Sequence, residues 1–302
     1  EEGHITLFDE VEFGLEPHRI TRLIKHVRED KLGQYFLTTH SPSVLRELTV
    51  KELYVVHSKG GVVQIISAAN EGLTQLELQG KIRSSTEAFL AKKVVVCEGA
   101  TEVGFVRGFD DYQVSVGKDP LSYHGVALLD ARGASKVKDL AKAFKTLGYE
   151  VSVLADADAE DQFSTADAAE LTKLGVFVHL WSDKLSLEER AFKDLPWTSV
   201  IDSLMLAQHE LGYPVYDHVS NAYKNPIDQD FETWSESDLL REAIGKAAKN
   251  GQKNGKDKGW FKDITRGDLW FKKVSHAFGD AAFLKKDLAV KLEKLWTWIE
   301  HV

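Results

Sequence analysis

The chain has very little cysteine and no long hydrophobic run. Its 302 residues include one cysteine, Cys97, which excludes an internal disulfide and fits a reducing, cytoplasmic environment. No apolar stretch approaches the length of a membrane span, and no signal peptide opens the sequence. The eleven histidines show no zinc-binding spacing with the lone cysteine. Because the sequence starts directly on a strand-like segment, we expect it to be part of a longer protein.

Positive charge is scarce in the middle of the chain and concentrated after it. The net charge is −9. Residues 151–240 contain 18 acidic and 5 basic residues, whereas residues 241–274 contain 10 basic and 4 acidic residues. An acidic region beside a basic one is compatible with a phosphate backbone held against bound cations. The alternative is that the lysines form only a solvated face.

The hydrophobic pattern predicts two α/β regions followed by helices. The first region is expected to contain two strands, a helix and a hairpin, at residues 4–8, 35–39, 20–27 and 53–66. From Lys93 onward four strands alternate with helices, and these strands are expected at residues 94–96, 126–129, 151–154 and 176–180. This alternation indicates a parallel sheet with helices on both faces. From Leu185 the pattern is mostly helical.

Two pairs of carboxylates stand where predicted strands of the second region end. Glu98 and Glu102 lie one helical turn apart after the first strand, and Asp156 and Asp158 lie two apart on extended chain after the third. The ends of parallel strands converge at one edge of a sheet, so the pairs are expected to meet. Clustered carboxylates favour a divalent cation, and oxygen ligands suit Mg²⁺ or Mn²⁺. The sequence therefore predicts a metal-dependent enzyme acting on phosphates; the alternative is that these residues only cap a helix and form a turn.

These motifs carry a resemblance to a known family. The segment 98–102, Glu-Gly-x-Thr-Glu, followed by Asp-x-Asp at 156–158, resembles a Toprim domain, the fold shared by DNA primases, topoisomerases and several nucleases. Earlier segments at 7–10, 14–17 and 39–42 are similar to the Walker B motif, the loop after it and the switch-histidine loop of an ABC-type ATPase. An ATPase end followed by a Toprim domain resembles the OLD (overcoming lysogenization defect) family of nucleases, which includes the Gabija defence nuclease.

The resemblance implies a domain organisation. Residues 1–68 are expected to be the C-terminal part of an ABC-type ATPase, and residues 69–91 a linker. Residues 92–184 are expected to form the Toprim catalytic core. Residues 185–302 are expected to be a helical extension that completes the nuclease site.

The ATPase-like part is expected to be idle in this chain. The resemblance makes Asp9 the outer magnesium partner, Glu10 the residue that orients the attacking water and His40 the γ-phosphate sensor. No Gly-x-x-x-x-Gly-Lys-Ser/Thr occurs in the sequence, so nothing here is expected to cradle the phosphates of ATP. ATP, and pairing as a homodimer through the ATPase, are therefore expected only in the full-length protein. On sequence alone, these three residues fit equally well as a strand-end turn and a loop histidine.

The resemblance also implies a two-metal nuclease site. Two Mg²⁺ or Mn²⁺ ions roughly 4 Å apart would activate a water and neutralise the leaving oxygen of a phosphodiester, and Ca²⁺ would substitute structurally. Glu98, Glu102, Asp156 and Asp158 are the implied ligands, and Glu98 and Asp156 the implied catalytic carboxylates. The family completes the metal shell with an acidic residue after the fourth strand, where this sequence has Ser186-Leu-Glu-Glu.

We assign Glu188 to that position, with Glu189 as the alternative. An exposed helix start capped by Ser186 would account for the same residues. The family also uses a lysine from the helical end to stabilise charge on the transferring phosphate. Lys262 is our choice over Lys258, although either lysine alone is also accounted for as a solvated charge.

The predicted function is that of a metal-dependent DNA endonuclease, a hydrolase without a covalent intermediate. Arg132 and Lys136, beside the end of the second strand, are candidates for contacts with the DNA backbone, as is Lys258. One alternative is an ATP-driven, SMC-like assembly module whose Toprim site only binds metal or a partner. A primase or a nuclease acting on structured RNA is a further alternative.

Overall fold

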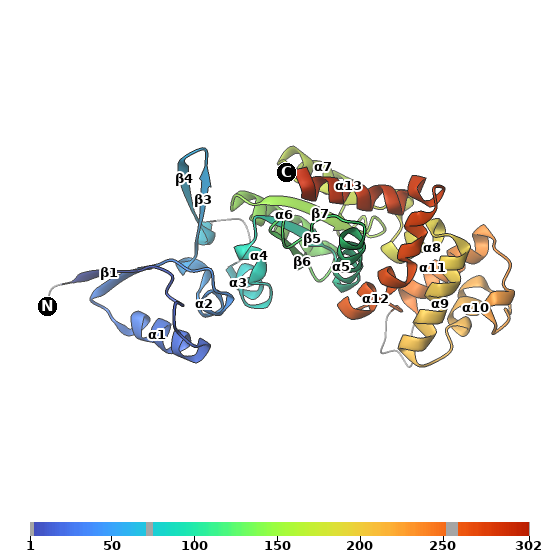
Figure 1. Ribbon diagram of the computed structural model, residues 1–302, viewed down its shortest axis with the longest axis horizontal. Coiled ribbons are helices and arrows are strands. Elements are labelled where there is room, and N and C mark those ends of the chain that lie inside the picture. The colour runs from blue at the N-terminus through green and yellow to red at the C-terminus, as the bar shows by residue number, and fades with distance from the viewer. Residues whose placement is uncertain (1–2, 71–74, 252–258, 302) are drawn as a thin grey trace. The chain divides into compact units, whose positions relative to one another are not determined.

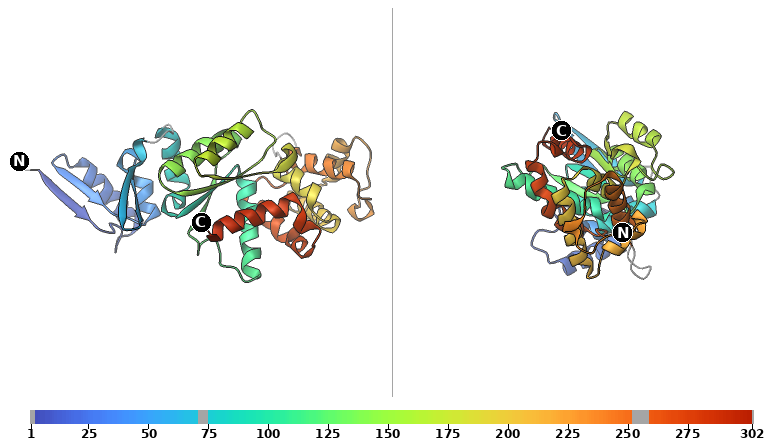
Figure 2. Two further views of the ribbon diagram at one scale, coloured as in Figure 1. Left: turned by 90° about the horizontal axis from the view of Figure 1, so that it is seen from above. Right: turned by 90° about the vertical axis from the view of Figure 1, so that its right-hand side faces the viewer.

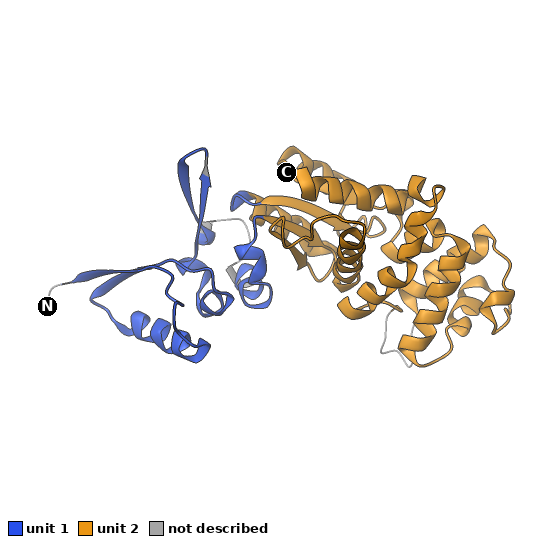
Figure 3. Ribbon diagram, in the orientation of Figure 1, with its two compact units in different colours: residues 1–92, 146–149 blue, residues 93–145, 150–302 orange. Residues whose placement is uncertain are grey.

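The computed structural model describes residues 3–70, 75–251 and 259–301. They form two compact units, coloured separately in Figure 3. Unit 1 comprises residues 1–92 and 146–149, and unit 2 comprises residues 93–145 and 150–302. None of the helices in the described part of the chain combines the length and hydrophobicity that a membrane-spanning segment needs.

Unit 1 contains two small sheets and several helices. The parallel pair β1 and β2 aligns His4 with Gly33, and β3 and β4 form the predicted antiparallel hairpin. Helix α1 starts with proline at its first turn and buries Ile20 and Ile24, which lie one turn apart. The elements are β1 (His4–Phe8), α1 (Pro17–Glu29), β2 (Gly33–Leu37), α2 (Pro42–Glu47), β3 (Tyr54–Lys59) and β4 (Val62–Ser67).

The stretch predicted as a linker, 69–91, contains two helices of unit 1. They are α3 (Gln75–Ser84) and α4 (Glu87–Leu90), and residues 71–74 lie outside the described part. Leu78 and Ile82 are fully buried one turn apart on α3, which explains why a mostly polar segment is helical. The segment 146–149 joins the same unit, since the Tyr149 hydroxyl donates a hydrogen bond of 2.7 Å to a carbonyl of α4.

Unit 2 is built on a four-stranded parallel sheet in the order β6-β5-β7-β8. The predicted α/β fold with a parallel sheet is confirmed. Cys97, the last residue of β5, aligns with Asp130 on one neighbour and Leu154 on the other. Every residue of β5 is buried, as expected for a central strand of a parallel sheet. The strands are β5 (Lys93–Cys97), β6 (Val126–Asp130), β7 (Glu150–Ala155) and β8 (Phe177–Leu180).

Helices cover both faces of this sheet, as predicted (Figures 1 and 2). Helix α5 (Ala100–Ser115) lies on one face together with the C-terminal helix α13 (Asp287–His301). Helices α6 (Val137–Thr146) and α7 (Thr165–Lys173) lie on the other face. The opposite placement of α5 and α6 follows from right-handed crossovers, because β6 and β7 lie on opposite sides of β5.

The rest of unit 2 is helical and shares one hydrophobic core with the sheet and α5. Trp260, Trp270, Trp296 and Trp298 are buried in this core, where they pack against other apolar side chains. Phe105 of α5 packs edge-on against Trp270, with ring centroids 5.1 Å apart. The remaining helices are α8 (Leu187–Asp194), α9 (Trp197–Leu211), α10 (Tyr216–Tyr223), α11 (Asp238–Asn250) and α12 (Ile264–Val274).

Candidate functional site

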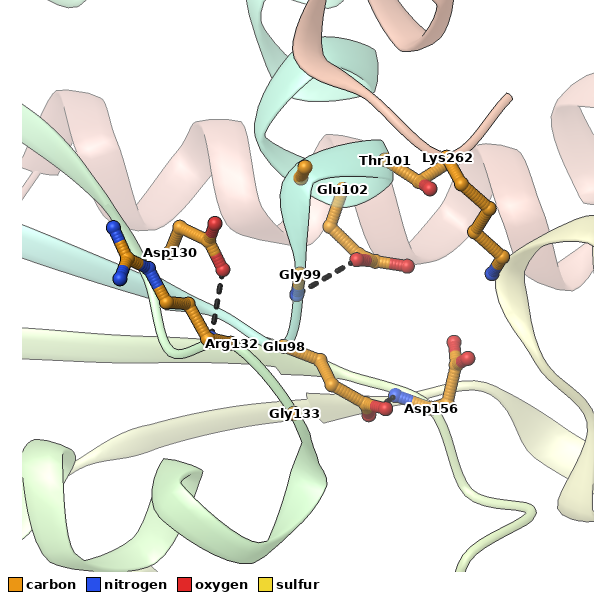
Figure 4. Close-up of a pocket in the computed structure, with 10 residues that line it drawn as sticks. Glu98, Gly99, Thr101, Glu102, Asp130, Arg132, Gly133, Asp156 and Lys262 are labelled. Carbon is orange, nitrogen blue, oxygen red and sulfur yellow. Dashed lines mark hydrogen bonds between the residues drawn. The ribbon is translucent and has the colours of Figure 1, made fainter. Parts of the chain in front are cut away.

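A pocket of about 420 Å³ opens at the carboxyl ends of the strands in unit 2 (Figure 4). The end of β5, the first turn of α5 and the ends of β6 and β7 contribute to it, and one lysine reaches it from just before α12. Its lining residues are Glu98, Gly99, Ala100, Thr101, Glu102, Asp130, Arg132, Gly133, Asp156 and Lys262.

Glu98 and Asp156 meet because β5 and β7 are neighbours in the sheet. Each carboxylate follows directly on the last residue of its strand. The backbone amide of Asp156 donates a hydrogen bond of 2.9 Å to Oε2 of Glu98. Burial raises the pKa of Glu98, although this hydrogen bond acts in the opposite direction. The two strand ends are thus tied together through the carboxylate itself.

Glu102 lies in the first turn of α5 and is buried. Its Oε2 accepts a hydrogen bond of 2.9 Å from the backbone amide of Gly99, which caps the start of the helix. Burial, followed by the negative charge of Glu188, raises the pKa of Glu102 to about 7. In Figure 4 its side chain points into the same space as those of Asp156 and Lys262.

Asp156 links β7 to helix α8. Its Oδ1 accepts a hydrogen bond of 2.8 Å from the backbone amide of Leu187, at the start of α8. Burial and then the charges of Glu102 and Glu98 raise the pKa of Asp156 well above its usual range. This carboxylate is therefore mostly buried and crowded by like charges.

The expectation that Asp156 and Asp158 lie on extended chain is wrong. Strand β7 ends at Ala155, and residues 157 and 158 form a bend. The bend is held by a hydrogen bond of 3.2 Å from the amide of Ala157 to the carbonyl of Leu185. Asp158 is consequently turned toward helix α11, where its carboxylate pairs with Lys249.

Glu188 is the more buried of the two glutamates that begin α8. Its side chain is fully buried, its Oε1 lies 2.6 Å from Nζ of Lys262, and its Oε2 has no hydrogen-bond partner among the described residues. The Ser186 side chain caps the helix by accepting a hydrogen bond from the amide of Glu189. We call Glu98, Glu102, Asp156 and Glu188 the acidic cluster; each raises the pKa of a neighbour, and Asp158, which pairs with Lys249, also raises the pKa of Glu98 and Asp156.

The backbone just before Lys262 is fixed in place, which holds this lysine beside the acidic cluster. The Thr101 hydroxyl donates a hydrogen bond of 3.0 Å to the carbonyl of Phe261, and Phe261 itself is fully buried. Gly259 has a φ of +81°, and a Cβ there would lie 2.8 Å from the Lys262 side chain. Burial alone would lower the pKa of Lys262, but the charge and hydrogen bond of Glu188, together with the charges of Glu102 and Asp156, outweigh it, so the pKa is raised and the ammonium stays charged. Its side chain remains 39% exposed and so accessible from the pocket.

Lys249 was not predicted from the sequence. It lies in the last turn of α11 and contacts the carboxylates of Asp158 and Glu189, the latter at 3.3 Å. The charge counts pointed to the basic region as a whole, but no local pattern distinguishes this lysine from its neighbours. Lys262 therefore pairs with Glu188, whereas Lys249 pairs with Asp158 and Glu189.

The candidate DNA-contacting residues are placed differently from one another. Arg132 is exposed, lines the pocket and has a left-handed backbone with a φ of +64°. Its amide donates a hydrogen bond of 2.7 Å to Oδ1 of Asp130, which stabilises this turn. Lys136 is exposed in the turn 134–136 and does not line the pocket. Lys258 lies outside the described residues.

The ATPase-like residues lie together in unit 1. Asp9 accepts a hydrogen bond of 2.6 Å from the Thr38 hydroxyl, and Glu10 has a left-handed φ of +46°. The backbone amide of His40 donates a hydrogen bond of 2.8 Å to Glu12, which the sequence did not single out. Glu12 also accepts one from Thr39, so it fixes the loop that carries His40.

The acidic cluster fits a divalent cation by its chemistry. In the described part of the chain, no three Asp, Glu, His or Cys side chains are already arranged as a metal-binding group. The donors are nonetheless all carboxylate oxygens, which hard cations such as Mg²⁺ and Mn²⁺ prefer. Oε2 of Glu188 is buried and has no hydrogen-bond partner in the described part of the chain, and a buried carboxylate oxygen is costly unless something binds it.

A comparison with protein-family models identifies one part of the chain. Residues 89–158 match the family model described as the overcoming lysogenization defect protein-like TOPRIM domain. No curated protein matches the sequence. Two similar solved structures are the C-terminal region of the Xanthomonas campestris pv. campestris OLD protein and that of the Burkholderia pseudomallei OLD protein.

The likeness to these two structures is distant. The Xanthomonas region is 16% identical, with a TM-score of 0.36, and the match covers 71% of this chain and 99% of that structure. The Burkholderia region is 15% identical, with a TM-score of 0.33, and the match covers 69% and 98%. TOPRIM domains generally bind divalent metals, and the OLD-like ones are of a nuclease type. The chain contains an OLD-like TOPRIM domain, which holds Glu98, Glu102, Asp156 and Asp158.

Proposed function

We propose that this chain is a divalent-metal-dependent endodeoxyribonuclease, the C-terminal half of an OLD-family ATPase–nuclease. The observation that supports this most strongly is the acidic cluster, in which buried carboxylates raise the pKa of one another. Such charges repel one another unless protons or bound cations neutralise them, and a divalent cation would do so at neutral pH. The orphaned Oε2 of Glu188 offers such a cation a ligand inside the cluster.

In this proposal the acidic cluster and Asp158 hold two divalent cations, Mg²⁺ or Mn²⁺, with Ca²⁺ as a structural substitute. When bound, the cations would help to ionise the attacking water and would neutralise the leaving oxygen of a phosphodiester. The chain's own part is to hold its carboxylates in fixed directions. Glu98 accepts the amide of Asp156, and Asp156 accepts the amide of Leu187, so both acids point into the pocket through backbone contacts.

Positive side chains at the pocket suit a phosphate backbone. Lys262 carries a charged ammonium, still partly exposed, beside Glu188, and it would stabilise negative charge on the transferring phosphate. Arg132 is exposed just after β6 and lines the pocket, and its guanidinium would contact a neighbouring phosphate. Lys136 and Lys258 would add contacts farther along the DNA. These cations would position DNA without reading its sequence.

The remaining parts of the proposal rest on the family resemblance. Asp9, Glu10 and His40 would act in ATP binding and hydrolysis only in the full-length protein. That protein would pair as a homodimer through its ATPase, in the cytoplasm, with a role in phage defence. The end of the ATPase-like part at residue 68 and the Toprim core at residues 92–184 belong to the same proposal, whereas α3 and α4 make residues 75–91 a part of unit 1 rather than a linker.

The deciding experiment is plasmid cleavage without ATP. Purified chain is incubated with supercoiled plasmid in Mg²⁺, in Mn²⁺ or in EDTA, and nicked and linear products are quantified. Glu98→Ala and Asp156→Ala should each lower cleavage by at least about a hundredfold, because each removes a carboxylate from the cluster. Asp161→Ala, which changes an exposed aspartate shortly after β7, should cleave like the unchanged chain.

Each outcome separates the candidate functions. Cleavage in EDTA, or cleavage that persists in both cluster variants, would show that the acidic cluster is not the nuclease site. Metal binding without cleavage of any nucleic acid would favour the assembly module that only binds. Cleavage of structured RNA but not of plasmid would replace DNA by RNA as the substrate.

A further inference from the structure

Lys249 forms a second contact between positive charge and the carboxylates of the site, apart from Lys262. Its ammonium contacts Asp158 and lies 3.3 Å from Oε2 of Glu189. Its side chain is 26% exposed, and those of Asp158 and Glu189 are 19% and 16% exposed. Such a pair is partly removed from water, so each contact is stronger than a pair on an open surface.

The position of Lys249 follows from how α11 packs against α8. Gly245 lies one helical turn before Lys249 on the same face of α11. A Cβ at Gly245 would lie 2.9 Å from Cα of Glu189, so the two helices approach each other as closely as glycine allows. The approach brings Lys249 to both carboxylates at once. It is therefore held in place by the fold rather than by a chance surface contact.

The two lysines divide the carboxylates into two groups. Lys262 contacts Glu188 of the acidic cluster, and Oε2 of Glu188 has no hydrogen-bond partner within residues 3–70, 75–251 and 259–301. Lys249 contacts Asp158 and Glu189, so one ammonium offsets part of the charge of both carboxylates. A divalent cation that binds Asp158 must therefore compete with an ammonium that contacts both carboxylates of its group, whereas among the described residues Lys262 pairs with Glu188 alone of the four cluster carboxylates. The two groups differ in how readily they take a cation.

We propose that Lys249 is a built-in competitor that makes the Asp158–Glu189 side of the site the weaker of two cation-binding positions. The first divalent cation binds the acidic cluster, and a second binds only when it displaces the Lys249 ammonium. Asp158 is then a ligand whose availability Lys249 controls. The inference rests on the proposed function, because it concerns the same metal site, and it specifies the order in which the site fills.

The test is a titration of the whole chain with Mn²⁺, in which free Mn²⁺ is followed by its electron paramagnetic resonance signal. The unchanged chain should bind two ions whose dissociation constants differ by about tenfold or more. Lys249→Met, which keeps the length of the side chain and removes its charge, should tighten the weaker position by about tenfold and leave the tighter one unchanged. Lys246→Met removes an exposed charge from the same helix, where Lys246 pairs only locally with Glu242, and should bind as the unchanged chain does.

Two further variants cover the case in which Lys249→Met does not fold, which circular dichroism would show. Lys249→Arg keeps the positive charge and should retain the weak second position. Asp158→Asn should lose the weaker position and keep the tighter one. Loss of the tighter position in Asp158→Asn would overturn the proposal, because Asp158 would then belong to the first cation.

Failure of this inference can be told apart from failure of the proposed function. If the unchanged chain binds no Mn²⁺, both fail. If it cleaves DNA with metal but binds two ions equally, or if Lys249→Met leaves the weaker position unchanged, only the inference fails, and Lys249 merely braces α11 against α8.

Discussion

His179 is a buried side chain that makes the stability of the fold depend on pH. It lies in β8 with its side chain buried, and its Nε2 has no hydrogen-bond partner in the described part of the chain. Burial, followed by the charges of Lys291 and Lys294 on α13, lowers the pKa of His179 to about 4. In the unfolded chain the pKa of histidine is near 6.5. As the pH falls from about 6.5 to 4, His179 therefore becomes protonated in the unfolded chain while it stays neutral in the folded chain.

The first prediction follows from that difference. The contribution of His179 to stability is complete above about pH 6.5 and should be lost toward pH 4, by up to about 3 kcal/mol in the free energy of unfolding. His179→Leu should lack this component, so the stabilities of variant and unchanged chain should converge or cross as the pH falls. Urea unfolding at pH 7.5, 6.0 and 5.0 measures the difference. Parallel pH profiles for the two proteins would contradict the assignment.

Other single residues show what the sequence could and could not predict. Glu98 and Asp156 were expected to meet, and they do, because a carboxylate that directly follows a strand can be placed by the strand alone. Glu188 was preferred over Glu189, and it is the glutamate that pairs with Lys262. Lys249 was missed because its place depends on the packing of α11 against α8, which has no local pattern.

The crossing of α5 and α12 is the element-scale feature that places Lys262. The two helices contact each other at glycines, which are Gly104 and Gly108 on α5 and Gly267 on α12. A Cβ at Gly104 would lie 2.9 Å from Cα of Gly267 and 2.8 Å from the amide nitrogen of Asp268. The start of α12 is thus pressed against the first turns of α5, just after the segment that carries Lys262. The close crossing therefore joins the lysine to the helix of Glu102.

The second prediction tests this crossing. Gly104→Ala should force the two helices apart, since its Cβ meets backbone atoms that cannot rotate away, at a cost of about 1 to 3 kcal/mol. It should also move Lys262 away from Glu188 and reduce metal-dependent cleavage in the fraction that remains folded. Gly279→Ala is the control, because a Cβ there meets nothing within 4 Å. Equal thermal unfolding of the two variants would show that the crossing tolerates a side chain.

At the scale of helices and strands, the sequence predicted the parallel sheet but missed two helices and a bend. Alternating strands and helices gave the parallel sheet, because apolar runs and helical periodicity are local signals. The stretch 69–91 was expected to be a linker, yet it contains helices α3 and α4. Their buried apolar residues are few, so they are hard to recognise in a mostly polar segment. The bend at residues 157 and 158 depends on a contact with Leu185, which lies about thirty residues farther along the chain. Non-local contacts of this kind have no signature in the residues around them.

At the scale of the whole molecule, the tryptophans offer a probe of one unit. The sequence contains seven tryptophans, and all lie in unit 2, at positions 181, 197, 234, 260, 270, 296 and 298. Trp260, Trp270 and Trp296 are fully buried or nearly so. Tryptophan fluorescence therefore reports the unfolding of the unit that holds the acidic cluster, while unit 1 contributes no tryptophan signal.

The third prediction uses this probe to measure metal binding through stability. A cation that binds only the folded chain, at a hundred times its dissociation constant, stabilises it by about 2.7 kcal/mol. For a unit of this size, that corresponds to a rise of roughly 5 to 10 °C in the unfolding temperature. Mg²⁺ should therefore raise the midpoint seen by tryptophan fluorescence, and Glu98→Ala should abolish the rise. Glu12→Ala, in unit 1, should keep it. A rise of equal size in Glu98→Ala would mean that Mg²⁺ stabilises unit 2 at some place other than the acidic cluster.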